Sequence, residues 1–192
     1  MRHMKHNDRS HSSALRRRAR KIRIVLMDVD GVLTDGRIFI CAEDGGRVAD
    51  MKLFHAHDGF GLKVAKQMGL VTGVISGRSS PATARRAIEL GMDFVLQGQQ
   101  NKLLAYKQVL KQTGATDDEV CYIGDDLPDL PLLRRVGLAV SVPNAAVEAH
   151  ENAHYITDRP GGEGAVREVI ELILKAKGQW REAVAMFMSR DE

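Results

Sequence analysis

The chain has 192 residues, which suits one domain with a substantial core, and its composition excludes several classes of protein. No apolar run approaches the length of a membrane span, and residues 1–20 lack the apolar stretch of a secretory signal. Residues 1–23 hold nine Lys or Arg against one Asp, whereas the other 169 residues hold 19 basic and 24 acidic side chains. We therefore predict a mildly acidic cytoplasmic domain that binds neither nucleic acid nor membrane, preceded by a basic flexible arm over residues 1–21.

Short apolar runs alternate with longer segments of helical period, which indicates a parallel sheet with helices on both faces. The predicted strands are residues 23–28, 71–75, 94–96, 120–123, 138–140 and 154–156. The predicted helices are residues 59–68, 80–90, 101–112, 128–136, 145–151 and 164–177. The fold class is therefore α/β, a doubly wound Rossmann-like parallel sheet in a domain over residues 22–177.

Two segments depart from this alternation. Residues 36–54 hold two β-prone runs, 37–40 and 48–54, around a Gly-Gly turn, which predicts a hairpin that projects from the loop after the first strand. Residues 178–192 place apolar side chains near helical spacing, which predicts a short amphipathic tail. Cys121 lies within an apolar run, and we expect a buried, reduced thiol.

Polar residues follow the carboxyl ends of the predicted strands, where an open α/β sheet binds its ligands. Carboxylates brought together at such an edge repel one another unless a cation compensates, and oxygen ligands favour Mg²⁺. In chain order these residues are Asp28, Asp30, Ser76, Arg78, Lys102, Asp125, Asp126 and Asp129.

This set of residues indicates phosphoryl transfer, in which catalysis is mostly positioning and charge neutralisation. Asp28 is the predicted nucleophile, since an aspartate can accept a phosphoryl group covalently. Asp30 is placed to protonate the leaving oxygen and later to deprotonate the attacking water. Ser76 and Lys102 supply a hydroxyl and a positive charge for the phosphate. Gly31 is expected to let the chain turn close to the phosphate without a Cβ in the way.

Four motifs in this region, residues 28–34, Ser76, Lys102 and residues 124–129, resemble those of the haloacid dehalogenase superfamily of phosphatases. They occur in the correct order, each at a strand end. Further segments are similar to the family of 3-deoxy-D-manno-octulosonate 8-phosphate phosphatases, and the similarity covers roughly residues 22–180. The segments are residues 54–62, 76–80, 97–102, 124–129 and 160–168. The resemblance implies a magnesium-dependent phosphatase of this eight-carbon sugar-acid phosphate, acting through an aspartyl-phosphate in lipopolysaccharide biosynthesis.

The resemblance also implies roles for particular residues. Mg²⁺ is held by Asp28, by the backbone carbonyl of Asp30 and by Asp125, with support from the other acids of the fourth motif. The catalytic residues are Asp28, Asp30, Ser76 and Lys102. The substrate-binding residues are Asp30, His55, Ala56, His57, Asp58, Gly59, Lys63, Gly77, Arg78, Arg86 and Lys102.

The spacing of the motifs leaves no room for a cap domain. Forty-one residues separate Thr34 from Ser76, and 21 separate Lys102 from Gly124. A site without a cap must still exclude water. The resemblance implies a homotetramer for this purpose, in which the hairpins assemble a barrel-like centre and neighbouring chains help to close the site.

Other interpretations remain open. His57 stands where many relatives have Arg, so a related nine-carbon sugar-acid phosphate is an alternative substrate. A non-catalytic oligomerisation module is a second alternative, although Asp28, Asp30, Lys102 and Asp125 together argue against it. For single residues, Ser76 could cap the following helix and Arg86 could lie on a solvated helix face. His55 and His57 lack the third ligand of a zinc site. The loop over residues 160–162 is expected to have a structural role, in the turn into the last helix.

Overall fold

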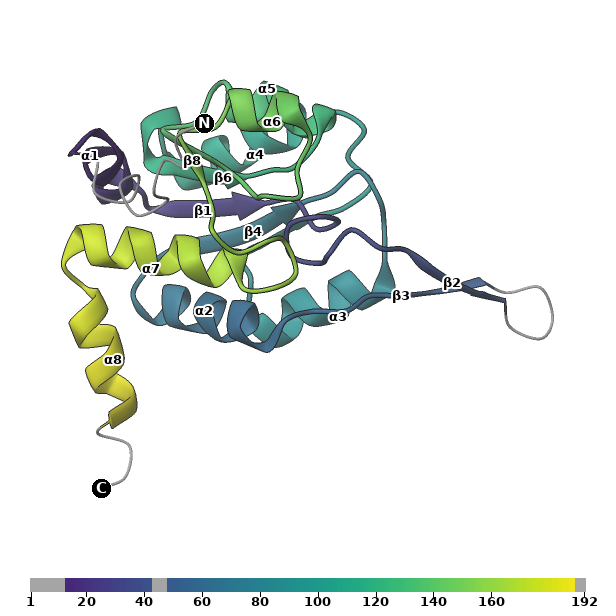
Figure 1. Ribbon diagram of the computed structural model, residues 1–192, viewed down its shortest axis with the longest axis horizontal. Helices are drawn as coiled ribbons and strands as arrows, with labels where there is room; N and C mark the ends of the chain where they lie inside the picture. Colours follow the sequence, from purple (N-terminus) through teal and green to yellow (C-terminus); the bar gives the residue numbers. More distant parts are fainter. Residues whose placement is uncertain (1–12, 43–47, 189–192) are drawn as a thin grey trace, which may run out of the picture.

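The computed structural model describes residues 13–42 and 48–188. In this part of the chain six strands form one parallel sheet in the order β5-β4-β1-β6-β7-β8 (Figure 1). The strands are β1 (Ile24–Met27), β4 (Val71–Ile75), β5 (Phe94–Leu96), β6 (Val120–Ile123), β7 (Leu138–Ser141) and β8 (Tyr155–Ile156). The predicted fold class, an α/β doubly wound parallel sheet, is confirmed, and the crevice beyond the carboxyl end of β1 is the switch point at which such sheets bind ligands.

Helices cover both faces of this sheet (Figure 1). One face carries α1 (Ser13–Lys21), α2 (Ala56–Gln67), α3 (Pro81–Leu90) and α7 (Ala165–Lys177). The other carries α4 (Lys102–Thr113), α5 (Leu130–Leu133) and α6 (Val147–Glu151), with short 3₁₀ turns η2 (Asp117–Glu119) and η3 (Leu127–Asp129). Two hydrophobic cores result, one on each side of the sheet.

The central strand β1 is apolar throughout because both of its faces are buried. Successive side chains of a strand point to opposite faces, and both faces of this sheet are covered. Val25 and Met27 of β1 belong to the core under α2 and α7, whereas Ile24 and Leu26 belong to the core under α4. A strand in this position has no polar face until it ends, at Asp28.

Side-chain caps fix the starts of the two helices that border the site. Ser80 Oγ accepts the backbone N–H of Thr83 at 3.3 Å and begins α3. Asn101 caps α4 in the same way, which places Lys102 in the first turn of that helix. Because Ser80 fills this role, the alternative in which Ser76 caps α3 is wrong.

Two predicted helix boundaries are also wrong. The helix predicted over residues 128–136 is divided into η3 and α5, because Pro128 and Pro131 each lack an N–H and stand in the first turn of a short helix. Helix α2 begins at Ala56, three residues before the prediction, because the His55 ring accepts the N–H of His57 at 3.2 Å and caps it.

The prediction of a flexible arm over residues 1–21 is wrong for residues 13–21, and residues 1–12 lie outside the described chain. Residues 13–21 form α1, which packs against α7. Leu15 and Ala19 are buried in the core on this face, while Arg18 Nη1 donates to the Gly137 carbonyl at 2.8 Å. Two apolar residues four apart are enough to dock an otherwise basic helix.

The predicted hairpin is present and projects from the body of the molecule (Figure 1). Strand β2 (Phe39–Ala42) begins two residues after the predicted run 37–40, and β3 (Val48–Met51) is shorter than the predicted run 48–54. The turn between them lies outside the described residues. Several of its large apolar side chains are exposed, namely Ile38, Phe39, Ile40, Met51 and Leu53. An apolar surface on a projecting hairpin is typical of a contact site for another chain.

The tail forms helix α8 (Trp180–Met188), and its apolar stripe packs on its own chain. The ring of Phe187 lies 4.9 Å from that of Phe60 in α2, and the Arg167 guanidinium lies 5.1 Å from the centre of the Trp180 ring. Cys121 is buried in β6, and burial raises the pKa of its thiol. No helix among residues 13–42 and 48–188 is long and apolar enough to cross a membrane.

Candidate active site

Asp28 and Lys102 meet at the carboxyl edge of the sheet, as the sequence predicted. Asp28 follows the last residue of β1, and its Oδ2 lies 3.0 Å from Nζ of Lys102. The Lys102 side chain is only 4% exposed, so its charge acts in surroundings that screen it weakly. An ammonium group therefore lies beside the predicted nucleophile, where it can bind a phosphate oxygen.

Asp129 orients both Lys102 and the loop after β6. Its Oδ1 accepts from Lys102 Nζ at 2.7 Å and from the Tyr122 hydroxyl at 2.6 Å. Its Oδ2 accepts the backbone N–H groups of Asp125 and Asp126 at 3.0 and 3.3 Å. Asp129 is completely buried, so these four hydrogen bonds are what make its charge tolerable there. Sequence reasoning missed Tyr122, whose only signal was its place near the end of a strand.

The residues present fit a bound Mg²⁺. Carboxylate oxygens of Asp28, Asp125 and Asp129 lie within 4.8 Å of one another. Oδ1 of Asp28 and Oδ1 of Asp125 are buried and have no hydrogen-bond partner among the described residues. Such atoms are costly unless a ligand satisfies them, and a hard divalent cation prefers oxygen donors of this kind.

Both orphaned carboxyl groups have raised pKa values in the absence of an ion. Burial, followed by the charges of Asp129 and Asp28, raises the pKa of Asp125 to about 8. Burial also raises the pKa of Asp28 to about 6, against the opposing effect of Lys102. Because burial is the main cause of both shifts, the ionised form of each carboxyl group is costly at this site unless a bound cation compensates it.

Gly31 lies against the carboxylate of Asp125. Its φ angle is +96°, which L side chains rarely adopt, and a Cβ added there would lie 2.0 Å from Oδ2 of Asp125. The expectation that Gly31 leaves room for the phosphate stays a prediction. The absent side chain makes room for the Asp125 carboxylate.

The loop around Pro160 supports the nucleophile loop, a role beyond the turn predicted for it. Asn144 bridges the two loops: its Nδ2 donates to the Gly31 carbonyl at 3.2 Å and its Oδ1 accepts the Gly161 N–H at 2.8 Å. The N–H of Gly162 donates to the Val32 carbonyl at 2.9 Å. A Cβ on Gly161 would lie 1.8 Å from the Gly31 carbonyl oxygen, so glycine is required for this approach. Sequence reasoning missed Asn144, which follows β7 as the acids follow β1 and β6.

Asp30 lies between two cations. Nζ of Lys52 contacts its Oδ1, and Nε of Arg78 lies 3.9 Å from its Oδ2. Ser76 is buried at the end of β4, where its Oγ accepts the Arg78 N–H at 3.2 Å, and Gly77 lies between these two residues. The predicted group of Asp30, Ser76 and Arg78 is thus brought together, and Lys52 joins it without having been predicted.

At the start of α2 the structure separates the predicted substrate contacts. Ala56 and His57 are exposed in the first turn, and His55 is half-buried as the cap. Asp58, in contrast, is fully buried, and its two oxygens accept the backbone N–H groups of Gly164 and Arg167 at 3.1 and 2.8 Å. The prediction of a substrate contact is wrong for the Asp58 side chain, because that carboxylate caps α7.

Arg86 lies against α2 and not on a solvated face. A Cβ on Gly59 would lie 2.3 Å from Arg86 Nη2, and the guanidinium carbon lies 5.9 Å from the centre of the Phe54 ring. Its Nη1 pairs with Glu89 at 2.8 Å, while Nε is buried without a hydrogen-bond partner in the described chain. The hydrogen bond and charge of Arg86, with a smaller effect of the exposed Lys63, lower the pKa of Glu89.

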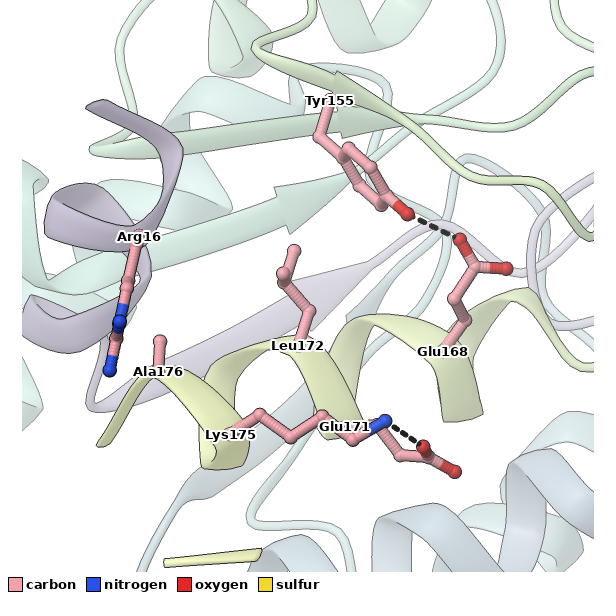
Figure 2. Close-up of a pocket in the computed structure, with 7 residues that line it drawn as sticks. All are labelled: Arg16, Tyr155, Glu168, Glu171, Leu172, Lys175 and Ala176. Carbon is pink, nitrogen blue, oxygen red and sulfur yellow. Dashed lines mark hydrogen bonds and ion pairs between the residues drawn. The ribbon is translucent and has the colours of Figure 1, made fainter. Parts of the chain in front are cut away.

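A pocket of about 420 Å³ lies apart from this edge, between α1, α7 and β8 (Figure 2). Some of its polar groups pair with each other: the Tyr155 hydroxyl donates to Glu168 at 2.7 Å, and Lys175 pairs with Glu171 at 2.7 Å (Figure 2). Its lining residues are Arg16, Tyr155, Glu168, Glu171, Leu172, Lys175 and Ala176. It contains no predicted site residue, so the candidate active site is the acidic edge at β1.

A parallel sheet with an acidic edge at the end of its central strand is typical of phosphohydrolases. The family model of haloacid dehalogenase-like hydrolases matches residues 62–170, a range that includes Ser76, Lys102 and Asp125. The 3-deoxy-D-manno-octulosonate 8-phosphate phosphatase KdsC of Escherichia coli strain K12 is 39% identical over 166 residues, which are 86% of each chain.

Solved structures agree with this relationship. The 3-deoxy-D-manno-octulosonate 8-phosphate phosphatase of Moraxella catarrhalis, in complex with magnesium ion, phosphate ion and KDO, is 42% identical, with a TM-score of 0.86 over 92% of this chain and 99% of that one. The cobalt-bound enzyme of Haemophilus influenzae is 36% identical, with a TM-score of 0.78 over 84% and 92% of the two chains. This chain belongs to the haloacid dehalogenase-like hydrolases and, within them, to the family of 3-deoxy-D-manno-octulosonate 8-phosphate phosphatases.

Proposed function

We propose that this chain is a magnesium-dependent phosphatase that hydrolyses 3-deoxy-D-manno-octulosonate 8-phosphate to the free sugar acid and phosphate, a step in lipopolysaccharide biosynthesis. One observation carries the proposal. The buried oxygens of Asp28 and Asp125 lack partners within the described chain, beside a buried Lys102 and in a family whose members act on this ester. A purely structural domain would not need such a costly arrangement.

The residues divide the work as follows. Asp28, Asp125 and the backbone carbonyl of Asp30 would hold Mg²⁺, which supplies charge neutralisation for the phosphate. Lys102 and Ser76 bind phosphate oxygens and hold the phosphorus in line with Asp28. These two residues act by positioning and by charge.

Asp28 attacks the phosphorus and Asp30 gives its proton to the leaving sugar oxygen, which leaves an aspartyl-phosphate on Asp28. A water molecule then attacks the phosphorus, the bond to Asp28 breaks, and Asp30 takes the proton of the water. Both carboxyl groups return to their starting states, so the cycle is closed.

The sugar end of the substrate would meet residues around the site that differ in their exposure. Arg78 and Arg86 suit the carboxylate of a sugar acid, because a guanidinium binds carboxylates through two parallel hydrogen bonds. The remaining proposed contacts are His55, Ala56, His57, Gly59, Lys63 and Gly77.

We also propose a cytoplasmic homotetramer in which the exposed apolar side chains of the hairpin meet those of other chains. Ile40 and Leu53 are 69% and 65% exposed, which is unfavourable for residues of this kind in an isolated chain. Light scattering is expected to give four chains per particle. Ile40→Lys is expected to lower that number, and a fully active wild-type monomer would refute the shared site.

The chemistry is tested by phosphate release. Activity is expected to require Mg²⁺, to disappear on addition of a chelator, and to fall at least about 10³-fold in Asp28→Asn, because the nucleophile is lost. Persistent activity in that variant would exclude the covalent scheme. A wild-type chain that releases no phosphate in the presence of Mg²⁺ would instead favour the non-catalytic module.

The substrate is tested by a panel of sugar phosphates ranked by kcat/KM. The eight-carbon sugar-acid phosphate is expected to rank first. Equal turnover of the nine-carbon sugar-acid phosphate would remove the narrow assignment, and in that case His57→Arg is the variant with which to look for a restored preference.

A further inference from the structure

Lys52 is a buried lysine that contacts the proposed general acid. It follows the last residue of β3 directly, where the hairpin returns to the body of the molecule. Its side chain is only 4% exposed, and its Nζ contacts Oδ1 of Asp30, whose own side chain is 17% exposed. Lysine is almost never buried to this degree unless it is paired, so the contact has a cost that needs an explanation.

The two oxygens of Asp30 have different surroundings. Lys52 occupies Oδ1 from within the protein, whereas Arg78 reaches Oδ2 only at 3.9 Å and with half of its side chain, 52%, in solvent. An ammonium group fixed at Oδ1 restricts rotation of the carboxyl group. Oδ2 is then the oxygen that remains for the leaving group or for water.

We propose that Lys52 is a positioning residue for Asp30, holding its carboxyl group on the leaving-group side of the site. This inference rests on the proposed function, in which Asp30 gives a proton to the sugar oxygen as the ester P–O bond breaks and regains one from water. Lys52 keeps its own protons throughout and neither touches the phosphorus nor contributes to its bonds. Proximity of a proton donor matters most where the leaving oxygen is a poor leaving group.

The same contact links the hairpin to the catalytic loop. Residue 52 is the first after β3, and Asp30 lies in the loop after β1, so the ion pair fixes the exit of the hairpin beside the site. Because β3 does not belong to the six-stranded sheet, loss of the pair is expected to leave the strand pairing of that sheet intact.

The experiment compares two esters that differ in their need for an acid. The sugar-acid phosphate has an alkoxide leaving group, whereas p-nitrophenyl phosphate releases a stable phenolate that needs little protonation. In Lys52→Met, kcat/KM for the sugar-acid phosphate is expected to fall about 10²-fold, within the range of general acid catalysis, and that for p-nitrophenyl phosphate by less than about threefold. Lys52→Arg, which keeps the charge, is expected to recover part of the loss.

Two further variants make the result specific. Lys111→Met removes one exposed lysine from the last turn of α4, at the opposite end of the helix from Lys102, and is expected to leave kcat/KM for both esters unchanged. In an Asp30→Asn background, Lys52→Met is expected to add less than about twofold to the loss, because the group it positions is already gone.

Three outcomes would overturn the inference. Equal losses for both esters would make Lys52 a structural residue, and a rise in KM alone for the sugar-acid phosphate would make it a substrate contact. Additive losses in the double variant would show that Lys52 acts independently of Asp30. Failure of the proposed function is a separate result, since the wild-type chain with Mg²⁺ would then hydrolyse neither ester.

Discussion

A side chain on Gly31 would collide with the carboxylate of Asp125, since the position of its Cβ lies 2.0 Å from Oδ2. Gly31→Ala is therefore expected to displace Asp125, weaken Mg²⁺ binding and lower kcat at least about 10²-fold, as a small misplacement of a catalytic group can do. Calorimetric titration with Mg²⁺ and initial rates measure both effects.

Gly69→Ala is the matched control, because Gly69 also has a positive φ, +77°, but a Cβ there meets nothing within 4 Å. It is expected to cost stability through backbone strain alone and to keep wild-type Mg²⁺ affinity. Equal loss of affinity in the two variants would show that strain, and not contact with Asp125, explains the glycine at position 31.

Asp129 is expected to be needed for folding as well as for activity. Asp129→Ala leaves Lys102 and the Tyr122 hydroxyl without their buried partner, and loss of one member of a buried ion pair costs about 3–5 kcal/mol. Urea denaturation measures this cost. Asp118→Ala is the control, because it removes the exposed ion pair with Lys21, which contributes about 1 kcal/mol or less to the free energy of unfolding. An equal loss of stability in the two variants would show that burial of the Asp129 pair does not matter.

The acidic cluster predicts how the stability of the metal-free protein depends on pH. The pKa values of Asp28 and Asp125 are raised to about 6 and about 8, so between pH 4 and 8 the folded state binds more protons than the unfolded state. The free energy of unfolding therefore falls as pH rises through this range. The contribution of Asp28 and Asp125 to the free energy of unfolding is fully present below pH 4 and is lost as pH rises past 8.

Magnesium is expected to reverse this trend. The ion binds ionised carboxylates, so its affinity and its stabilisation of the fold both increase as pH rises from 6 to 8. Melting temperatures measured at several pH values, with a chelator and with excess Mg²⁺, are expected to diverge at high pH. Asp125→Asn is expected to reduce this divergence, and parallel curves for the wild-type protein would contradict the metal site.

Asp58 is expected to stabilise the start of α7 and to make no direct contribution to substrate binding. Asp58→Ala leaves the N–H groups of Gly164 and Arg167 without their acceptor and is expected to cost about 1–3 kcal/mol in urea denaturation. Asp58→Asn keeps one acceptor oxygen and is expected to recover part of this stability. A tenfold rise in KM at unchanged stability would restore the original prediction of a substrate contact.

The sequence by itself determined the sheet and the acids at its edge. Continuous apolar runs such as residues 24–27 are required of a strand covered on both faces, and the chain direction of a parallel sheet brings the residue after each strand to one edge. Asp28, Lys102 and Asp125 could be placed together for that reason, without knowledge of any contact.

Only the tertiary structure decided the contacts that depend on how separate segments pack. The local sequence does not distinguish Asp58 from its exposed neighbours, although α7 buries it. It likewise does not distinguish Gly31 from an ordinary turn glycine, although Asp125 lies against it. No local pattern indicates the role of Lys52. Local patterns record periodicity along one element, whereas these roles arise between residues as many as 109 positions apart, from Asp58 to Arg167, whose proximity is set by the packed core.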